Sequence, residues 1–172
     1  AFRELPDMRV IEHDFRGFFG NVIQPLSKFL EVSFKSLPPG FTEAENAPKI
    51  TAKKVFLREL EEFVLFDPIV EYDKESHNML DDQPDISLEG DTVVYLSKDK
   101  EQENSFLSLV KGMHPEFDKN QSTGFLFLHI DDFVNNYWFL NFFEKLKEQD
   151  IEVFGFKDFK NFQYSPHRTT VR

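Results

Sequence analysis

The chain has 172 residues, a formal net charge of −11 and no cysteine. The missing cysteines exclude disulfides, thiolate nucleophiles and Cys-type zinc sites, and the excess of acidic residues disfavours a general phosphate-binding surface. The 22 phenylalanines supply a large apolar area per residue, so the sequence predicts a folded chain with a substantial core.

The hydropathy and the two ends of the chain indicate the cellular compartment in which the protein is expected. No run of about eighteen apolar residues is present, so no transmembrane helix is expected. No basic-then-apolar signal peptide opens the sequence. With the lack of cysteine, these features predict a cytoplasmic protein without membrane contact. Because the chain begins at Ala1 rather than Met and ends in HRTTVR, we expect a single domain excised from a longer protein.

The N-terminal part predicts a strand, a helix and a second strand. Met8–Ile11 is a candidate short strand, and Asp14 is a candidate N-cap for the helix, which Pro25 would end. The apolar stripe of this helix comprises Phe15, Phe18, Phe19 and Val22. Phe29–Phe34 alternates in polarity, which is typical of a strand buried on one face. Residues 36–49 are rich in Pro, Gly and acids and predict an exposed loop, the candidate sub-boundary of the domain.

The segment 50–72 predicts a hairpin. Its Leu, Glu and Lys content also allows a helix over the first half, but β-branched and aromatic residues dominate. Pro68 excludes a helix through that point. We expect strands at 54–58 and 62–72 with the turn near residues 60–62, and Pro68 at a sheet edge or a bulge.

The middle of the chain predicts two short strands and one helix. The strands are 78–80, within a polar stretch, and 92–96 (TVVYL). Asp99 is expected to cap a helix, with Gln102 completing a capping box, and Gly112 and Pro115 end it. The apolar face of the helix comprises Phe106, Leu107, Leu109, Val110 and Met113. A polar loop is expected at residues 118–124.

The clearest pattern in the chain lies between residues 124 and 162, where the hydrophobic period changes twice. Phe125–Ile130 and Ile151–Phe156 predict strands, and a helix with a 3.6-residue period lies between them. The helix stripe comprises Phe139, Phe142, Phe143 and Leu146. If both strands join one sheet, they form a parallel unit with a right-handed crossover. A turn or short helix should follow, and then an extended segment.

Together these elements predict an α+β fold. We expect a mostly antiparallel sheet, a C-terminal strand–helix–strand unit and two to three helices.

The sequence offers little for catalysis or cofactor binding. Neither GxxxxGK[ST] nor GxGxxG occurs, so no loop is expected to cradle phosphates. GxSxG is absent as well. No HxxxH or HxH spacing links the five histidines, which we interpret as surface or packed residues: His13, His77, His114, His129 and His167. We therefore expect no cofactor and no catalytic residue in this segment.

Two acidic groups require an interpretation. Asp131 and Asp132 follow a buried strand beside His129, where carboxylates often bind ligands. They are either metal or acid–base groups of a small hydrolase, or a helix N-cap or turn near a positive helix end, and we favour the helix start. Asp81, Asp82 and Asp85 lack the spacing of a calcium loop.

Aromatic and basic residues alternate in the C-terminal quarter. They comprise Tyr137, Trp138, Lys157, Phe159, Lys160, Phe162, Tyr164, His167 and Arg168. Such a stripe either stacks single-stranded nucleic acid or forms a core with a solvated basic rim. The candidate contacts to nucleic acid or to a protein partner are Trp138, Lys157, Lys160, Tyr164, His167 and Arg168.

Three segments resemble the region upstream of the motor in bacterial Swi/Snf-family helicases, particularly large ones from Bacteroidetes. They are VFLRELEEFVLFDPIVEYD, ENSFLSLVKGMHPEF and WFLNFFEKLKEQDIEVFGFKDFKNFQYSPHR, within residues 50–170. The resemblance implies a DNA-dependent ATPase whose two RecA-like lobes bind ATP and duplex DNA. The Walker A lysine and DEAH-type acids of that motor have no counterpart here, so no catalytic residue carries over.

The resemblance implies an N-terminal accessory domain that packs on the motor of the same chain, regulates it or binds a protein partner. An acidic surface of such a domain would mimic or repel DNA and so gate the motor. The alternatives are a DNA-contacting module that uses the basic, aromatic C-terminal quarter and a small metal-dependent hydrolase. DNA contact is disfavoured by the net charge.

Overall fold

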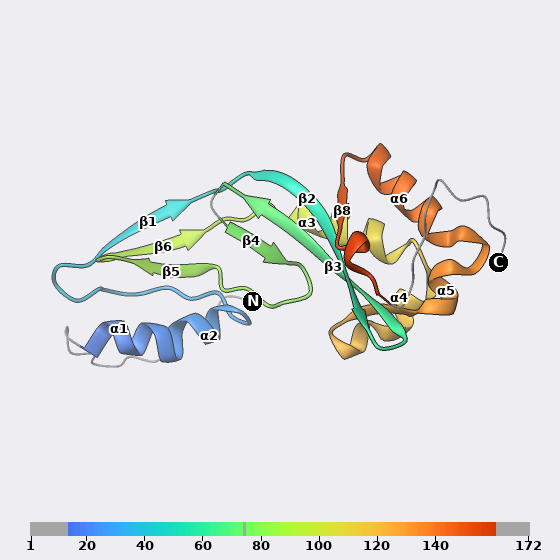
Figure 1. Cartoon of the computed structure of the whole chain (residues 1–172). Helices are drawn as coiled ribbons and strands as arrows, with labels where there is room; N and C mark the ends of the chain where they lie inside the picture. The colour runs from blue at the N-terminus through green and yellow to red at the C-terminus, as the bar shows by residue number, and fades with distance from the viewer. Residues whose placement is uncertain (1–13, 74, 161–172) are drawn as a thin grey trace. The chain divides into compact units, whose positions relative to one another are not determined.

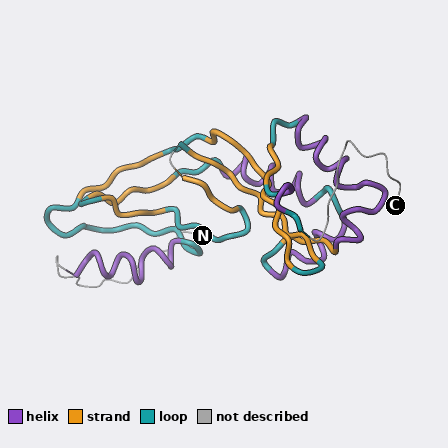
Figure 2. Tube along the Cα trace, in the orientation of Figure 1, coloured by secondary structure: helices purple, strands orange, loops and turns teal. Residues whose placement is uncertain are grey.

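The computed structural model describes residues 14–73 and 75–160, and its fold class is α+β, as expected (Figures 1 and 2). The chain forms two compact units. Unit 1 contains the described parts of Ala1–Lys49 and of Asp82–Lys100, and unit 2 those of Ile50–Asp81 and Glu101–Arg172. The first crossing, after Lys49, falls at the end of the loop in which a sub-boundary was expected. The chain then returns to unit 1 after Asp81, because strands from distant parts of the sequence pair there.

Unit 1 begins with a continuous helical segment. It comprises α1 (Phe15–Phe18), the π-helical turn η2 (Phe19–Ile23) and α2 (Gln24–Ser27). Phe15, Phe19 and Ile23 are its buried stripe. Pro25 does not end the helix, contrary to expectation. It lies in the first turn of α2, after the π-helical turn, where a missing N–H is tolerated. Asp14 occupies the N-cap position, although its side chain does not make the capping hydrogen bond.

The sheet of unit 1 has the order β1-β6-β5. Its strands are β1 (Thr42–Asn46), β5 (Ile86–Glu89) and β6 (Thr92–Leu96). β1 runs parallel to β6, and β5 is antiparallel to it across the turn at Gly90. Val93 and Ile86 pack with Phe15, Phe19 and Ile23 in a small separate core.

Two predictions in this region were wrong. β1 lies within the expected loop 36–49, and all five of its residues are exposed, so the apolar pattern that identifies strands is missing. Phe29–Phe34, the expected strand, is irregular apart from a single bridge residue. Within it Val32 is buried, whereas Phe29 is 73% exposed. The candidate strand Met8–Ile11 lies outside the described residues.

The sheet of unit 2 is built on the predicted hairpin. β2 (Ile50–Leu60) and β3 (Phe63–Tyr72) pair antiparallel around the turn at Glu61 and Glu62. β4 (Glu75–Asn78) and β7 (Leu126–His129) pair with opposite ends of β3, along one edge. β8 (Glu152–Phe154) pairs with β2 on the other side of the hairpin.

Pro68 is accommodated in β3 by the gap between β4 and β7. β7 pairs with residues 63–66 and β4 with residues 69–72, so no ladder hydrogen bond is required from residue 68 on that edge. The carbonyl of Pro68 faces the same edge, where it accepts the Met79 N–H at 2.8 Å. The prediction of a local edge position is confirmed.

The predicted C-terminal unit is split by the hairpin. β7 is antiparallel to β3, which is antiparallel to β2, which is parallel to β8. β7 and β8 therefore run in the same direction, as expected, but β3 and β2 lie between them. Both strands are shorter than the predicted ranges.

The helices of unit 2 include the two predicted ones, α3 (Lys100–Lys111) and α6 (Trp138–Glu148). α3 begins directly after Asp99, and its helical stretch stops before Gly112, as expected. The expected loop 118–124 instead contains the end of α4 (Pro115–Asn120) and the 3₁₀ turn η3 (Gln121–Thr123). His114 explains this helix, because its Nδ1 accepts the Glu116 N–H at 3.1 Å. The remaining helical segments are α5 (Ile130–Val134) and the 3₁₀ turns η4 (Asn135–Tyr137) and η5 (Phe156–Asp158).

The core of unit 2 lies between one face of this sheet and the helices. The sheet contributes Val55, Leu57, Val64, Phe66 and Val70. The helices contribute Phe106, Val110, Phe117, Phe133, Phe139, Phe142 and Leu146. All of these side chains are buried. A buried polar pair joins them, in which the Tyr72 hydroxyl donates to the Glu103 carboxylate on α3.

Gly155, directly after β8, has a conformation that favours glycine. Its φ is +92°, and a Cβ at this position would lie 2.2 Å from the carbonyl oxygen of Leu57. The chain therefore approaches the edge of β2 more closely than any residue with a side chain allows. This approach lets Phe156 and Phe159 join the core.

Candidate functional site

The predicted C-terminal contact surface is only partly described. Tyr164, His167 and Arg168 lie outside the described residues. Lys157 and Lys160 are exposed. Trp138 is half-buried, and its indole N–H donates to the carbonyl oxygen of Met113 at 3.0 Å.

The Trp138 ring is packed on other rings from several sides. It stacks on Phe142 with centroids 4.9 Å apart, and it meets Phe66 and Phe117 edge to face at 5.9 and 6.2 Å. Phe159 is buried as well. These rings contribute to the core of unit 2, and Phe142 covers one face of the Trp138 ring.

The acidic pair after β7 lies at a helix start, as favoured. Asp131 and Asp132 occupy the first turn of α5, although the capping residue is His129 rather than either aspartate. The Nδ1 atom of His129 accepts the Asp131 N–H at 3.1 Å, and its Nε2 lies 3.5 Å from a carboxylate oxygen of Glu62. The ring nitrogen that faces Asp131 is thus engaged in capping.

The other acidic group is dispersed. Asp81 is exposed at the end of its stretch in unit 2, and Asp82 is exposed at the start of the stretch that belongs to unit 1. Asp85 also belongs to unit 1, where Lys98 and Lys100 lie 3.8 and 3.6 Å from its Oδ1. Among the residues that the structure describes, no group of three or more His, Asp and Glu is arranged to hold a metal ion.

A surface that the sequence analysis did not single out is the second face of the unit 2 sheet. Along β2 and β3, alternate residues point away from the helices, and several of them are large and apolar. Together with neighbouring residues of β7 and β8 they define what we term the open face: Phe56, Leu60, Phe63, Phe127 and Phe154. Phe56, Leu60 and Phe63 are among the exposed large apolar side chains of the chain, with Leu60 58% exposed.

The rings of the open face contact one another across the strands. Phe56 stacks on Phe154 with centroids 6.4 Å apart and an interplanar angle of 19°. Phe63 meets Phe127 edge to face at 5.6 Å and His129 at 5.5 Å. Cross-strand contacts of this kind stabilise a sheet modestly, and they join the rings of β2, β3, β7 and β8 into neighbouring pairs on this face.

Two ion pairs lie on the same face. Lys54 Nζ is within ion-pair distance of Glu71 and lies 5.1 Å from the centroid of the Phe154 ring. Arg58 binds Asp67, and this hydrogen bond to a carboxylate raises the pKa of the guanidinium above its ordinary value, although burial opposes the shift. The two basic residues of the open face are therefore both paired with acids.

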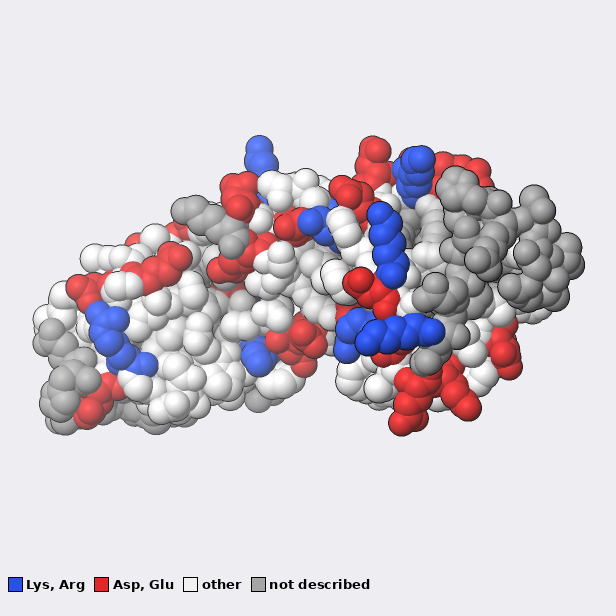
Figure 3. Space-filling model, viewed as in Figure 1, with Lys and Arg blue, Asp and Glu red and all other residues white. Residues whose placement is uncertain are grey.

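The hairpin end of the open face has an acidic rim. Glu61 and Glu62 form the turn between β2 and β3, and Asp131 lies in the first turn of α5, two residues after His129. The side chains of Glu62 and Asp131 are 78% and 86% exposed. Figure 3 shows Asp and Glu side chains at this end of the hairpin, with Lys and Arg side chains beside them.

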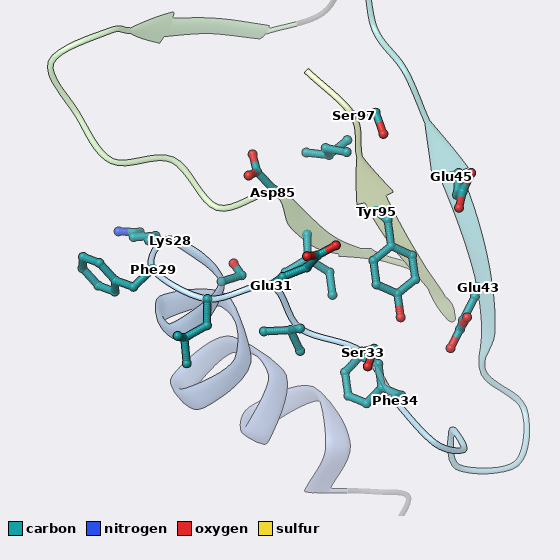
Figure 4. Close-up of a pocket in the computed structure, with 15 residues that line it drawn as sticks. Lys28, Phe29, Glu31, Ser33, Phe34, Glu43, Glu45, Asp85, Tyr95 and Ser97 are labelled. Atoms are coloured by element: carbon teal, nitrogen blue, oxygen red, sulfur yellow. The ribbon is translucent and has the colours of Figure 1, made fainter. Parts of the chain in front are cut away.

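Unit 1 contains a second candidate, an open hollow of about 660 Å³. Its acidic lining residues are Glu31, Glu43, Glu45 and Asp85, which come from the irregular segment after α2, from β1 and from the residue before β5 (Figure 4). Tyr95 of β6 lies among them. Partial burial, followed by the charge of Glu43 and a hydrogen bond to it, raises the pKa of Tyr95 to about 12.

An acidic hollow suits positively charged groups, but these acids are solvated or already face lysines. Asp85 faces Lys98 and Lys100. Glu43 and Glu45 lie on β1, all five residues of which are exposed to solvent. The hollow is therefore a weaker candidate than the open face.

The comparisons with known proteins add no relative. No family model, curated protein or solved structure matches the chain. Among the described helices, none has the length and apolar character needed to cross a bilayer.

Proposed function

We propose that this chain is a non-catalytic accessory module that binds a protein partner through the open face of its unit 2 sheet. The observation that supports the proposal is the asymmetry of that sheet. Helices cover one face, and the other presents solvent-exposed rings and Leu60. Clustered apolar side chains on a protein surface commonly mark interaction sites.

The resemblance to the region upstream of Swi/Snf motors suggests the partner. In this proposal the open face packs on the ATPase motor of the same polypeptide, or on a protein that regulates it. The module itself contributes no catalytic residue and no cofactor. Binding at the open face would bias the position of the motor and so change its response to DNA.

A protein partner fits the charges of the open face better than a nucleic acid does. Lys54 and Arg58 are neutralised by Glu71 and Asp67, so neither offers a free cation to a phosphate. The whole chain carries a net charge of −11. A backbone-binding surface requires clustered, unpaired Lys and Arg.

The direct test is a pair of matched variants in the full-length polypeptide. Leu60→Lys places a charge on the open face, and Leu140→Lys places one at an exposed position of α6 in the same unit. We expect Leu60→Lys to weaken the module–motor contact by about tenfold or more, because a charge in place of an exposed apolar interface residue costs over 1 kcal/mol. Leu140→Lys should leave it unchanged. The measurements are the yield of cross-links between module and motor and the rate of DNA-stimulated ATP hydrolysis.

The DNA-contacting alternative is tested on the isolated chain. Its affinity for single-stranded and duplex DNA is measured across a salt series. Micromolar binding with a steep salt dependence would overturn the protein-partner proposal. Equal effects of Leu60→Lys and Leu140→Lys on cross-linking and ATP hydrolysis would also overturn it.

A further inference from the structure

The chemistry of the partner can be inferred from the hairpin end of the open face, and this inference rests on the function proposed above. There the apolar side chains Leu60, Phe63 and Phe127 form what we term the hairpin-end patch. Phe63 and Phe127 are in edge-to-face contact, and Phe63 lies directly opposite Leu60 across the β2–β3 pair. The patch is thus one continuous apolar surface, and the exposure of Leu60 and Phe63 makes it accessible.

Carboxylates border this patch. Glu61 and Glu62 follow Leu60 in the turn, and Asp131 lies two residues beyond the end of β7. Glu62 and Asp131 face His129 from either side, at 3.5 Å each, and both remain highly exposed. The cation of the open face nearest in sequence to the turn is Arg58, which is bound to Asp67.

The position and the solvation of the carboxylates determine which segments can bind to the hairpin-end patch. An apolar segment that covers Leu60 and Phe63 must also approach Glu62 and Asp131, so an acidic flank would meet like charges and a basic flank opposite ones. The carboxylates are solvated, so their contribution acts mainly on selectivity and association rate and depends on salt.

We propose that the hairpin-end patch binds a partner segment with two or more apolar residues flanked by Lys or Arg. The apolar residues cover Leu60, Phe63 and Phe127. The basic flanks lie against Glu62 and Asp131. An acidic or uncharged segment of the same apolar content binds more weakly.

The experiment is a selection from a displayed library of random twelve-residue peptides on the immobilised 172-residue chain. Enriched peptides are synthesised with a fluorophore, and their affinities are measured by anisotropy at two salt concentrations. We expect apolar pairs with Lys or Arg flanks. The double variant Glu62→Gln/Asp131→Asn should bind them at least about fivefold more weakly at low salt, and less so at high salt. The matched control Glu144→Gln/Glu148→Gln, which removes two exposed charges from α6, should bind them as the unmodified chain does.

The outcomes separate this inference from the proposed function. If Leu60→Lys abolishes binding but the Glu62/Asp131 variant does not weaken it, or if the enriched flanks are acidic or neutral, the charge rule is wrong and the open face remains the binding surface. If Leu60→Lys has no effect, or no peptide is enriched, both proposals are overturned. Circular dichroism of each variant shows that it is folded before its affinity is compared.

Discussion

Arg58 and Asp67 form a two-point ion pair diagonally across the β2–β3 hairpin, on the face of the sheet away from the helices. Arg58 Nε donates to Oδ2 of Asp67 at 2.6 Å and Nη2 donates to Oδ1 at 3.2 Å. The two partners are unequally solvated, because the Asp67 side chain is 12% exposed and that of Arg58 is 50% exposed. The loss of stability should therefore depend on which of the two partners is replaced.

We expect Arg58→Met to destabilise unit 2 by about 2 kcal/mol, since it leaves a mostly buried carboxylate without its cation. Asp67→Asn should cost about 1 kcal/mol, because the amide oxygen still accepts from Arg58 and the guanidinium reaches water. Urea unfolding followed by the emission of Trp138, the only tryptophan, measures both. If Asp67→Asn lowered the free energy of unfolding more than Arg58→Met does, this would contradict the finding that Asp67 is the more buried partner of the pair.

Gly155→Ala should destabilise unit 2 by about 3 kcal/mol or more. The new Cβ would meet the Leu57 carbonyl at 2.2 Å, and the positive φ adds strain. Gly124→Ala is the matched control, with φ +83° and no atom within 4 Å of the added Cβ. It should cost only about 1 kcal/mol, the conformational part of the effect. Equal losses for the two variants in the same urea experiment would show that the close approach to β2 is not required.

The stability of unit 1 should fall in alkaline solution through Tyr95. Its pKa is raised from 10.0 in the unfolded chain to about 12 in the folded one, so folding favours the protonated phenol. This stabilisation is complete below pH 10 and is lost as the pH rises from 10 to about 12. Tyr95→Phe should remove the downward slope in this interval. Unfolding monitored by circular dichroism at several pH values tests it, and an unchanged slope would refute the role of Tyr95.

Trp138 should not respond to single-stranded DNA. Its indole N–H donates to the Met113 carbonyl and Phe142 stacks on its ring, so a base that stacked on that face would have to displace Phe142. We expect a blue-shifted emission that titration with oligothymidylate leaves unchanged at low salt. Quenching of this emission with a saturable dependence on the oligonucleotide would instead support the DNA-contacting alternative.

Several elements were predictable from local sequence alone. The β2–β3 hairpin follows from the β-branched and aromatic run around Pro68, and α6 from the regular spacing of Phe139, Phe142 and Leu146. In both elements, the spacing of apolar residues within the element itself indicates which side chains are buried. The separation of β7 from β8 could not be predicted, because the hairpin that lies between them comes from an earlier part of the chain.

The elements that were missed depend on long-range pairing or on single side chains. β1 has the sequence TEAEN and no apolar residue larger than Ala, so only its backbone pairing with β6 makes it a strand. α4 depends on the cap provided by His114. The open face has a sequence signal, since Phe56, Leu60 and Phe63 sit at the polar positions of an alternating strand pattern. However, the hairpin has apolar residues at both its odd-numbered and its even-numbered positions. Such a pattern is usually interpreted as a strand that is buried on both faces.

The parallel pairing of β1 with β6 has a consequence for the order of folding during synthesis. When β1 leaves the ribosome, its partner has not yet been made, and the whole β2–β3 hairpin is translated before β6 follows. β2 and β3 are joined by a two-residue turn and can pair as soon as they emerge. Nascent chains halted before residue 92 should therefore leave the amides of β1 unprotected from hydrogen exchange, and chains extended beyond β6 should protect them. The helical segment 15–27 packs against β5 and β6, so its core is complete only after both strands have been made.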